Sequence, residues 1–242
     1  MPSGGQLEIL GIIPARGGSK AVKRKNVRLL AGQPLISYTI EAARGSRELT
    51  RYICSTDDDE IAGLAESLGS AVLRRPPELA GDATPMQDVV HHVLESLCEQ
   101  TAYVPDIFVI LQPTAPLRTS AHIDEAIKTL MHSKADALVS VARVPAHYHP
   151  DWQFVLDSEM NLKRLGNGDL RDIVTRRQEL SPTYTRNGAI YACWFNSFRA
   201  SASFYGKTCI GYPMDPEDSV NIDSEEDLRL AELRLTARKD QQ

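Results

Sequence analysis

Cysteine is scarce in this sequence, and its spacing excludes two classes of protein. The four cysteines are widely scattered and include no Cys-x-x-Cys pair: Cys54, Cys98, Cys193 and Cys209. A small disulfide-stapled protein needs more cysteines at closer spacing, and a structural zinc site needs them paired. The pattern therefore predicts reduced thiols in the core of a cytosolic protein.

Long apolar runs and an excess of positive charge are also missing. No apolar run approaches the ~20 residues that a membrane-spanning helix needs. Residues 1–8 have neither the basic start nor the apolar core of a signal peptide. The formal net charge of −5 argues against a nucleic-acid partner. We therefore expect a cytoplasmic protein that binds neither a membrane nor nucleic acid.

What the sequence does contain is an alternation of apolar strands and amphipathic helices. Apolar and β-branched runs predict strands at residues 7–13, 51–56, 71–73, 106–111, 137–144, 188–195 and 219–223. Helical spacing and capping residues predict helices that start near Pro34, Asp57, Thr84, Ser120 and Ser224. This order is typical of an α/β, Rossmann-like fold, in which a mostly parallel sheet carries helices on both faces and binds ligands at the carboxyl ends of its strands.

The alternation stops between residues 145 and 186, which are polar and rich in turn-forming residues. We predict a single domain over residues 1–242, with an inserted lobe of short strands at about 145–186. His147 and His149 in this segment lack a nearby cluster of cysteines or carboxylates. A sugar contact or a dimer contact is therefore a better hypothesis for these histidines than a metal site.

The segment from Ile12 to Asn26 carries the strongest functional signal. Pro14 ends an apolar strand, and Gly17 and Gly18 then allow a tight turn whose N–H groups can point at one anion. Five cations lie within ten residues: Arg16, Lys20, Lys23, Arg24 and Lys25. The glycine spacing fits neither the dinucleotide fingerprint nor the P-loop. We interpret the segment as a different phosphate-binding loop, with a basic surface turn as the alternative.

Three further motifs lie near the ends of predicted strands. Arg75 opens an Arg-Pro-Pro turn, and Gln112 follows the strand at 106–111 within Leu-Gln-Pro-Thr-Ala-Pro-Leu-Arg. The two prolines force a non-helical exit, so the Gln112 amide is expected at the carboxyl end of its strand. Tyr191 ends Asn-Gly-Ala-Ile-Tyr and is either a ligand contact or a core ring, which strand periodicity does not decide.

Together these motifs resemble the signature of the N-acylneuraminate cytidylyltransferase family, the CMP-sialic acid synthetases. The resemblance runs from Ile12 to Leu230 in five motifs, and the first keeps every fixed position of the family's loop, with a more basic spacer. It implies catalytic roles for Arg16, Lys20 and Lys25. It also implies nucleotide contacts at Ala15, Arg16, Gly17, Asn26, Arg75, Thr84 and Gln112, and sugar-acid contacts at Gln112, Asn187 and Tyr191.

One motif departs from that family at a point that concerns metal binding. The family's Asp-Ile-Asp, whose two carboxylates hold Mg²⁺, reads Asn221-Ile222-Asp223 here. Residues two apart on a strand share a face, so both polar side chains are expected to reach one ion. Asn221 offers a carbonyl oxygen without charge, which makes Asp223 the dominant ligand and predicts a raised Mg²⁺ requirement.

The resemblance implies a cytidylyltransferase that joins CTP to a nonulosonic acid and gives the CMP-sugar and pyrophosphate. It also implies a homodimer in which the inserted lobe helps to build the partner's active site. Two other interpretations stay open. One is a nucleotidyltransferase for another sugar, such as an octulosonate acid or a sugar 1-phosphate. The other is a non-catalytic nucleotide-binding homologue, which the asparagine at position 221 suggests.

Overall fold

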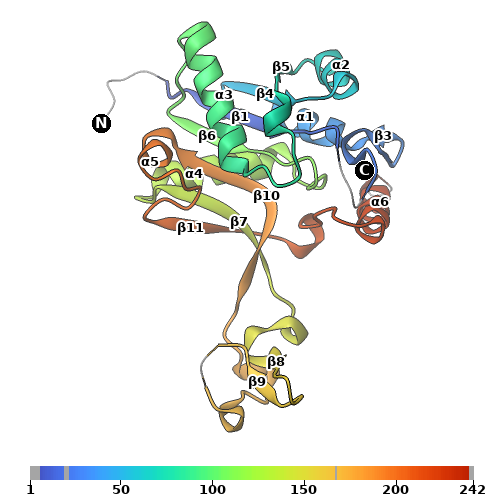
Figure 1. The fold of residues 1–242 in the computed structure, drawn as a ribbon, viewed down its shortest axis with the longest axis vertical. Helices are drawn as coiled ribbons and strands as arrows, with labels where there is room; N and C mark the ends of the chain where they lie inside the picture. Colours follow the sequence, from blue (N-terminus) through green and yellow to red (C-terminus); the bar gives the residue numbers. More distant parts are fainter. Residues whose placement is uncertain (1–5, 19–21, 167, 240–242) are drawn as a thin grey trace.

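A twisted central sheet organises the molecule (Figure 1). The computed structural model describes residues 6–18, 22–166 and 168–239. The strands of the sheet are β1 (Ile9–Pro14), β4 (Arg51–Thr56), β5 (Ala71–Arg74), β6 (Ile107–Ile110), β7 (Ala137–Arg143), β10 (Tyr184–Trp194) and β11 (Cys209–Met214). They pair in the order β5–β4–β1–β6–β10–β7–β11. β10 is antiparallel to both neighbours and the other pairs are parallel, which confirms the predicted α/β class.

Helices cover both faces of this sheet. α1 (Leu35–Gly45), α2 (Asp59–Ser67) and α4 (Ser120–His132) pack on one face, and α3 (Met86–Thr101) and α5 (Phe195–Ser201) pack on the other. In β1, Ile9 and Ile13 face the first group, whereas Leu10 and Ile12 face the second. All four side chains are at most 3% exposed, so β1 is buried on both sides.

A third apolar cluster lies beside the sheet, under the last helix. α6 (Glu225–Lys239) packs there against β2 (Leu29–Leu30), which pairs with β3 (Gln33–Pro34). Within the described residues, no helix combines the length and the apolar character needed to cross a membrane.

Two of the predicted helix starts are displaced by one residue. α2 is capped by Asp58 rather than Asp57, and α4 is capped by Thr119 rather than Ser120. In each case two adjacent residues have side chains that can cap a helix, and spacing alone does not separate them. The displacement matters for the site, because Asp57 is left to accept a hydrogen bond from the phosphate loop.

The strand predicted at residues 219–223 is wrong. These residues form a loop, in which Val220 and Ile222 pack against α6 and the Ile222 N–H donates to Thr114 O (2.8 Å). The last strand of the sheet is β11 instead. β11 escaped prediction because it is a half-exposed edge strand that contains Gly211 and Pro213, residues that usually interrupt strands.

The four cysteines are unpaired, as their spacing predicts. Cys54 and Cys193 lie in the core, and burial raises the pKa of the Cys54 thiol to about 12. The prediction of a core position is wrong for Cys98 and Cys209, which are exposed on α3 and on the edge strand β11.

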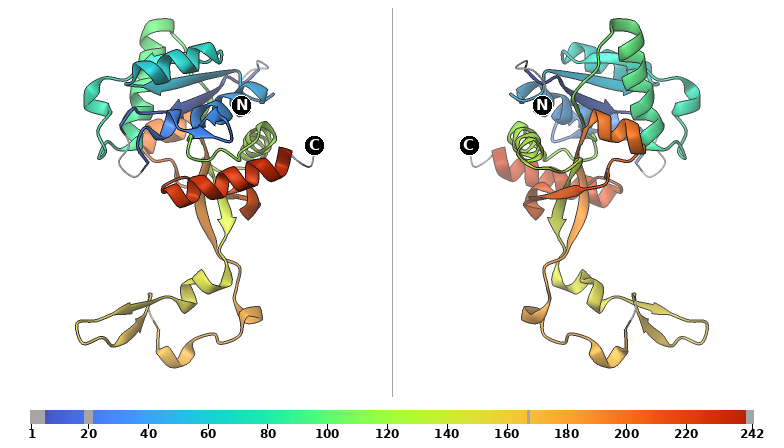
Figure 2. Two further views of the ribbon diagram at one scale, coloured as in Figure 1. Left: turned by 90° about the vertical axis from the view of Figure 1, so that its right-hand side faces the viewer. Right: turned by 90° about the vertical axis from the view of Figure 1, so that its left-hand side faces the viewer.

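Between β7 and β10 the chain leaves the sheet and forms a projecting lobe (Figure 2). β8 (Phe154–Leu156) and β9 (Leu162–Arg164) form their own two-stranded sheet. The other described residues of the lobe form loops and four 3₁₀ turns, at Ala146–Tyr148, Pro150–Trp152, Leu170–Asp172 and Arg177–Glu179. β10 begins at Tyr184, so its first three residues belong to the sheet and not to the lobe that the sequence pattern predicts.

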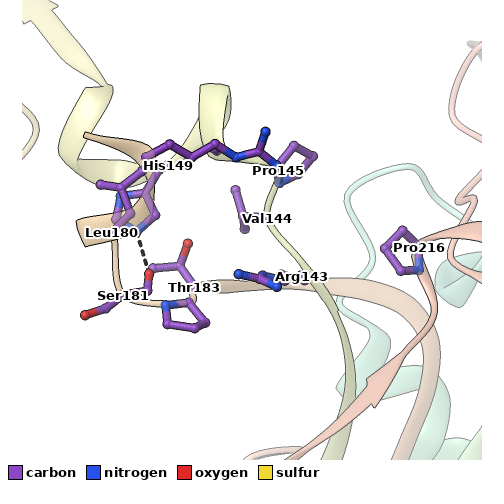
Figure 3. Close-up of a pocket in the computed structure, with 11 residues that line it drawn as sticks. Arg143, Val144, Pro145, His149, Leu180, Ser181, Thr183 and Pro216 are labelled. Atoms are coloured by element: carbon purple, nitrogen blue, oxygen red, sulfur yellow. Dashed lines mark hydrogen bonds between the residues drawn. The ribbon is translucent and has the colours of Figure 1, made fainter. Parts of the chain in front are cut away.

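A cavity of about 240 Å³ lies at the base of the lobe (Figure 3). His149 donates from Nε2 to Ser181 O (2.9 Å), and its Nδ1 accepts the Asp151 N–H (3.2 Å). Trp152 donates to Val174 O (2.5 Å). Both ring nitrogens of His149 are thus used inside the lobe, which leaves none for the ligand or dimer contact hypothesised from the sequence.

Candidate active site

The strand order reverses between β1 and β6, and the predicted phosphate loop and Gln112 follow these two strands. A cavity of about 460 Å³ lies here, at the carboxyl ends of the strands. Its lining includes six of the predicted site residues: Arg16, Lys25, Asn26, Arg75, Gln112 and Asp223. Motifs that are far apart in the sequence therefore meet at one site.

Arg16 lines this cavity from the loop after β1. Its guanidinium forms an ion pair with Asp82 (2.6 Å) and is 32% exposed. Asn26 is buried and donates from Nδ2 to the Arg16 carbonyl oxygen (2.8 Å), so it holds the loop in shape. A bound anion would compete with Asp82 for the Arg16 guanidinium.

Gly17 lets the loop approach the start of α2. Its N–H donates to Asp57 Oδ1 (3.0 Å), and a Cβ at this position would lie 2.5 Å from Asp58 Oδ2. Only glycine fits so close an approach. The Gly17 amide is therefore used within the protein and is not offered to an anion. Lys20, the third predicted catalytic cation, lies outside the described residues.

Arg75 brings a buried cation to the cavity wall. Its guanidinium donates to Ser55 Oγ (3.3 Å) and to Ser55 O (2.9 Å), and the residue is 7% exposed. Burial lowers the pKa of Arg75, and burial followed by the Arg75 charge lowers the pKa of His92. Arginine has five N–H donors, so these two contacts leave donors for a ligand.

Three predicted nucleotide contacts, Ala15, Gly17 and Thr84, are not among the described residues that line the cavity. Ala15 is fully buried, and its N–H extends the pairing of β1 with β4 by donating to Ser55 O (2.9 Å). The Thr84 N–H donates to Gly81 O (3.3 Å) in the turn before α3. Two neighbours that sequence reasoning missed, Asp82 and Met86, line the cavity instead.

Lys25, Asp223 and Asn221 form a chain of contacts at the cavity edge. Lys25 Nζ lies 2.5 Å from Ile222 O and 3.3 Å from Asp223 Oδ1. Asn221 donates from Nδ2 to Asp223 Oδ2 (2.6 Å), so the predicted metal pair is adjacent although it lies on a loop. In this rotamer, Asn221 turns its nitrogen and not its oxygen toward Asp223. In the described part of the chain, no group of three His, Cys, Asp or Glu residues is placed to hold a metal.

A smaller cavity of about 180 Å³ shares Gln112 with the larger one. The predicted sugar-acid contacts Gln112, Asn187 and Tyr191 all line it. Tyr191 fits both open interpretations, because its ring is 7% exposed in the core and still borders the cavity. Arg186, which sequence reasoning missed, also lines it, and contacts with the Tyr205 and Tyr191 hydroxyl groups raise its pKa.

An irregular stretch of β10 shapes the smaller cavity. The register with β7 shifts here, and Gly188 has a φ of +73°. Ser140 of β7 donates to Asn187 Oδ1 (2.6 Å) and accepts the Ile190 N–H (2.8 Å). Asn187 donates in turn to Ser219 Oγ (3.0 Å). Both ends of the Asn187 amide therefore hold this wall of the cavity in place.

Arg118 lies beneath the two cavities and links the chain segments that form them. It is 2% exposed and donates to Gln112 O (3.0 Å), Ala189 O (2.8 Å) and Thr39 Oγ1 (2.6 Å). Burial lowers the pKa of Arg118 to about 9. Its contacts tie the loop that carries Gln112 to the bulge in β10. In the sequence it is merely the last residue of a motif, and nothing in the local pattern indicates its burial.

Fold and site together define an α/β nucleotide-binding protein with a cation-rich cavity at the switch point of its sheet. The cytidylyltransferase family matches residues 10–193, and the chain belongs to this family. The family resemblance seen in the motifs is thereby confirmed.

Known relatives agree with this assignment. The chain is 34% identical over 230 residues to the CMP-N,N'-diacetyllegionaminic acid synthase of Legionella pneumophila, and the alignment covers 93% of this chain and 95% of that protein. It is 34% identical over 236 residues to the N-acylneuraminate cytidylyltransferase of Escherichia coli, with 97% of this chain covered. The chain spans about half of that second relative, 54% of its length.

A solved structure shows the same fold. The CMP:2-keto-3-deoxy-manno-octonic acid synthetase complexed with CTP is similar with a TM-score of 0.69 at 15% identity. The match covers 96% of this chain and 99% of that one.

Proposed function

We propose that this protein is a cytidylyltransferase that activates a nonulosonic acid of the N-acylneuraminate type with CTP. The observation that carries the proposal is the pair of adjoining cavities, which meet at Gln112. One is rich in cations, and the other is lined by hydrogen-bonding groups and Arg186. Membership of the cytidylyltransferase family and relatives named for CMP-sugar acid synthesis support it.

In this proposal CTP occupies the larger cavity and the sugar acid the smaller one. The anomeric oxygen of the acid, placed near Gln112, forms a bond to the α-phosphorus of CTP. The bond from that phosphorus to the oxygen that bridges the α- and β-phosphates breaks, and pyrophosphate leaves. The proton of the anomeric hydroxyl passes to solvent.

Positioning and charge supply the rate in this scheme. Arg16, Lys25 and Arg75 line the larger cavity and face the triphosphate, where negative charge gathers on the departing pyrophosphate. Removal of one such stabilising contact typically costs about 100- to 1,000-fold in turnover. A similar role for Lys20 stays a prediction.

We propose Mg²⁺ as the cofactor, with Asp223 as its carboxylate ligand. Mg²⁺ in nucleotide sites usually takes one or two carboxylates together with phosphate oxygens and waters. The Asp223 side chain lines the cavity and is 70% exposed, so it fits this pattern. The bound ion would neutralise phosphate charge. Asn221 as a second ligand stays a prediction, because its amide needs a half-turn to bring Oδ1 beside Asp223.

We further propose that the protein works as a homodimer in the cytoplasm, where CTP is available. The hairpin of the lobe exposes large apolar side chains, among them Leu156 (55%), Met160 (72%) and Leu162 (50%). A cluster of this kind on a projecting arm fits a surface that a second copy covers.

A substrate panel tests the proposed reaction. The protein is given CTP, Mg²⁺ and, in turn, N-acetylneuraminate, N,N'-diacetyllegionaminic acid, an octulosonate acid and a sugar 1-phosphate. Pyrophosphate release and the mass of the product are measured. We expect a CMP-sugar with a nonulosonic acid. Product from an octulosonate acid or a sugar 1-phosphate alone would support a nucleotidyltransferase for another sugar, and no product with any acceptor would support a non-catalytic homologue.

A further inference from the structure

The carbonyl oxygen of Asn221 is buried and has no hydrogen-bond partner in the part of the chain that the structure describes. The amide nitrogen of the same side chain is held by Asp223 (2.6 Å), which directs the oxygen to the opposite side. There it lies 3.2 Å from the point where a Cβ on Gly188 would stand. A buried acceptor without a partner is costly, so this oxygen calls for a donor from a ligand or a water.

A Cβ at position 188 would crowd this oxygen, and glycine avoids that contact. Gln112 Oε1 lies 3.8 Å from the same Cβ point, so two side-chain carbonyl oxygens lie beside Gly188. Asn221, Gln112 and Gly188 all line the smaller cavity. Carbonyl oxygens only accept hydrogen bonds, and the hydroxyl groups of a sugar are matching donors.

Arg186 brings a positive charge to the same small cavity. It makes no ion pair with a carboxylate among the described residues, and its contacts are the hydroxyl groups of Tyr205 and Tyr191. Arg186 is exposed, and these neutral partners leave its guanidinium able to bind an anion. A guanidinium is suited to bind a carboxylate through two parallel hydrogen bonds.

We propose that Arg186 binds the carboxylate of the sugar acid while Asn221 Oδ1 accepts a hydroxyl of the same molecule. This inference rests on the proposed function and assigns Asn221 to substrate selection. An aspartate at position 221 would place a second negative charge in the cavity that holds the substrate carboxylate. Asparagine keeps the acceptor and avoids that repulsion, which gives a physical reason for the departure from Asp-Ile-Asp.

The test compares the KM for the sugar acid with the KM for CTP in Arg186→Gln and Asn221→Ala. Arg186→Gln should raise the KM for N-acetylneuraminate about 10- to 100-fold, as expected for loss of a charge-assisted contact. Asn221→Ala should raise it about 3- to 10-fold, as expected for one neutral hydrogen bond. The KM for CTP and the Mg²⁺ concentration that gives half-maximal rate (the Mg²⁺ midpoint) should not change. Arg199→Gln, a cation on α5 that lines a separate cavity, is the matched control.

A second measurement distinguishes loss of the carboxylate contact from a general disruption of the site. Wild type should prefer the free acid over its methyl ester at least 10-fold, and Arg186→Gln should lose this preference. Unchanged acid KM values in both variants would overturn the inference and leave the proposed function intact. A raised Mg²⁺ midpoint in Asn221→Ala with an unchanged acid KM would also overturn it, since Asn221 would then serve the metal. If wild type neither turns over nor binds any acid, measured by ligand-observed NMR with CMP present, both proposals fail.

Discussion

The sheet core and the lobe hold their side chains in place by different means. In the core, Arg118 and Ser140 lie beneath the cavities and bond to the backbone of the elements that form the walls. In the lobe, β8 and β9 pair with each other, and Leu156 and Leu162 on this hairpin are 55% and 50% exposed. An isolated hairpin is marginally stable in water. The core therefore forms both cavities from its own side chains, whereas the lobe hairpin leaves large apolar side chains exposed.

The base of the lobe is held by internal hydrogen bonds, as the core is. His149 donates to Ser181 O (Figure 3), and Trp152 donates to Val174 O. These bonds tie the chain entering the lobe to the chain leaving it. The lobe is thus closed by internal hydrogen bonds at its base and exposes apolar side chains farther out. This combination is the basis of the proposal that a second copy covers the hairpin.

The largest effect is expected from loss of the core's cations. Arg16→Ala and Lys25→Ala should each lower turnover about 100- to 1,000-fold. The melting temperature should change little for Arg16→Ala, because a partly solvated ion pair contributes little to stability. Pyrophosphate release and thermal melts measure the two quantities. Arg24→Ala is the matched control, because Arg24 lies in the same loop but pairs with Asp58, outside the cavity. Near-normal turnover in both variants would remove the loop from the mechanism.

Removal of the Asp223 carboxylate should have the next largest effect. We expect Asp223→Ala to lose at least 10-fold in turnover at low Mg²⁺ and to need more Mg²⁺ for half-maximal rate, since its carboxylate is the proposed ligand. A titration of turnover against Mg²⁺ measures this. Full activity of Asp223→Ala at every Mg²⁺ concentration would place the metal site elsewhere.

Placing charges on the lobe hairpin tests the proposed difference between the lobe and the core. The double variant Leu156→Lys/Leu162→Lys should shift the protein from a dimer to a monomer of 26.8 kDa, because charges replace the apolar contact surface. Light scattering coupled to size exclusion measures the mass, and the core should melt at an unchanged temperature. Leu233→Lys, at a 70% exposed site on α6, controls for loss of a surface leucine. A wild-type protein that is active as a monomer would refute the dimer.

The smallest of these effects concerns the support beneath the small cavity. Ser140→Ala leaves the buried Ile190 N–H without its partner and removes one of the two donors to Asn187 Oδ1, which also accepts the Ala189 N–H (3.2 Å). Loss of partners for buried groups costs about 1–3 kcal/mol, which is about 2–4 °C in melting temperature for each kcal/mol in a chain of this size. The exposed Ser201→Ala is the control. Equal melting temperatures for the two variants would show that this network does not support the bulge.

Local patterns in the sequence were sufficient to predict six of the seven strands of the sheet, most helices and the meeting of the phosphate loop with Gln112. The pattern failed where two adjacent residues can both cap a helix, and where contacts between distant parts of the chain determine the structure. Asp57 and Asp58 are both good caps, and β11 is an edge strand with Gly and Pro. The burial of Arg118 arises from groups 71 and 79 residues away in the chain, Ala189 and Thr39. Similarly, the direction of the Asn221 amide is set by contacts that spacing does not encode.

The central claim is that pyrophosphate leaves CTP when the anomeric hydroxyl of a bound sugar acid attacks. The most direct measurement compares pyrophosphate release with saturating N-acetylneuraminate, or with whichever nonulosonic acid the panel selects, against release with the methyl glycoside of the same acid. We predict one pyrophosphate per CMP-sugar with the free acid and none above background with the glycoside, whose anomeric oxygen is blocked. Equal release with both compounds, or release that does not depend on any acid, would contradict the claim.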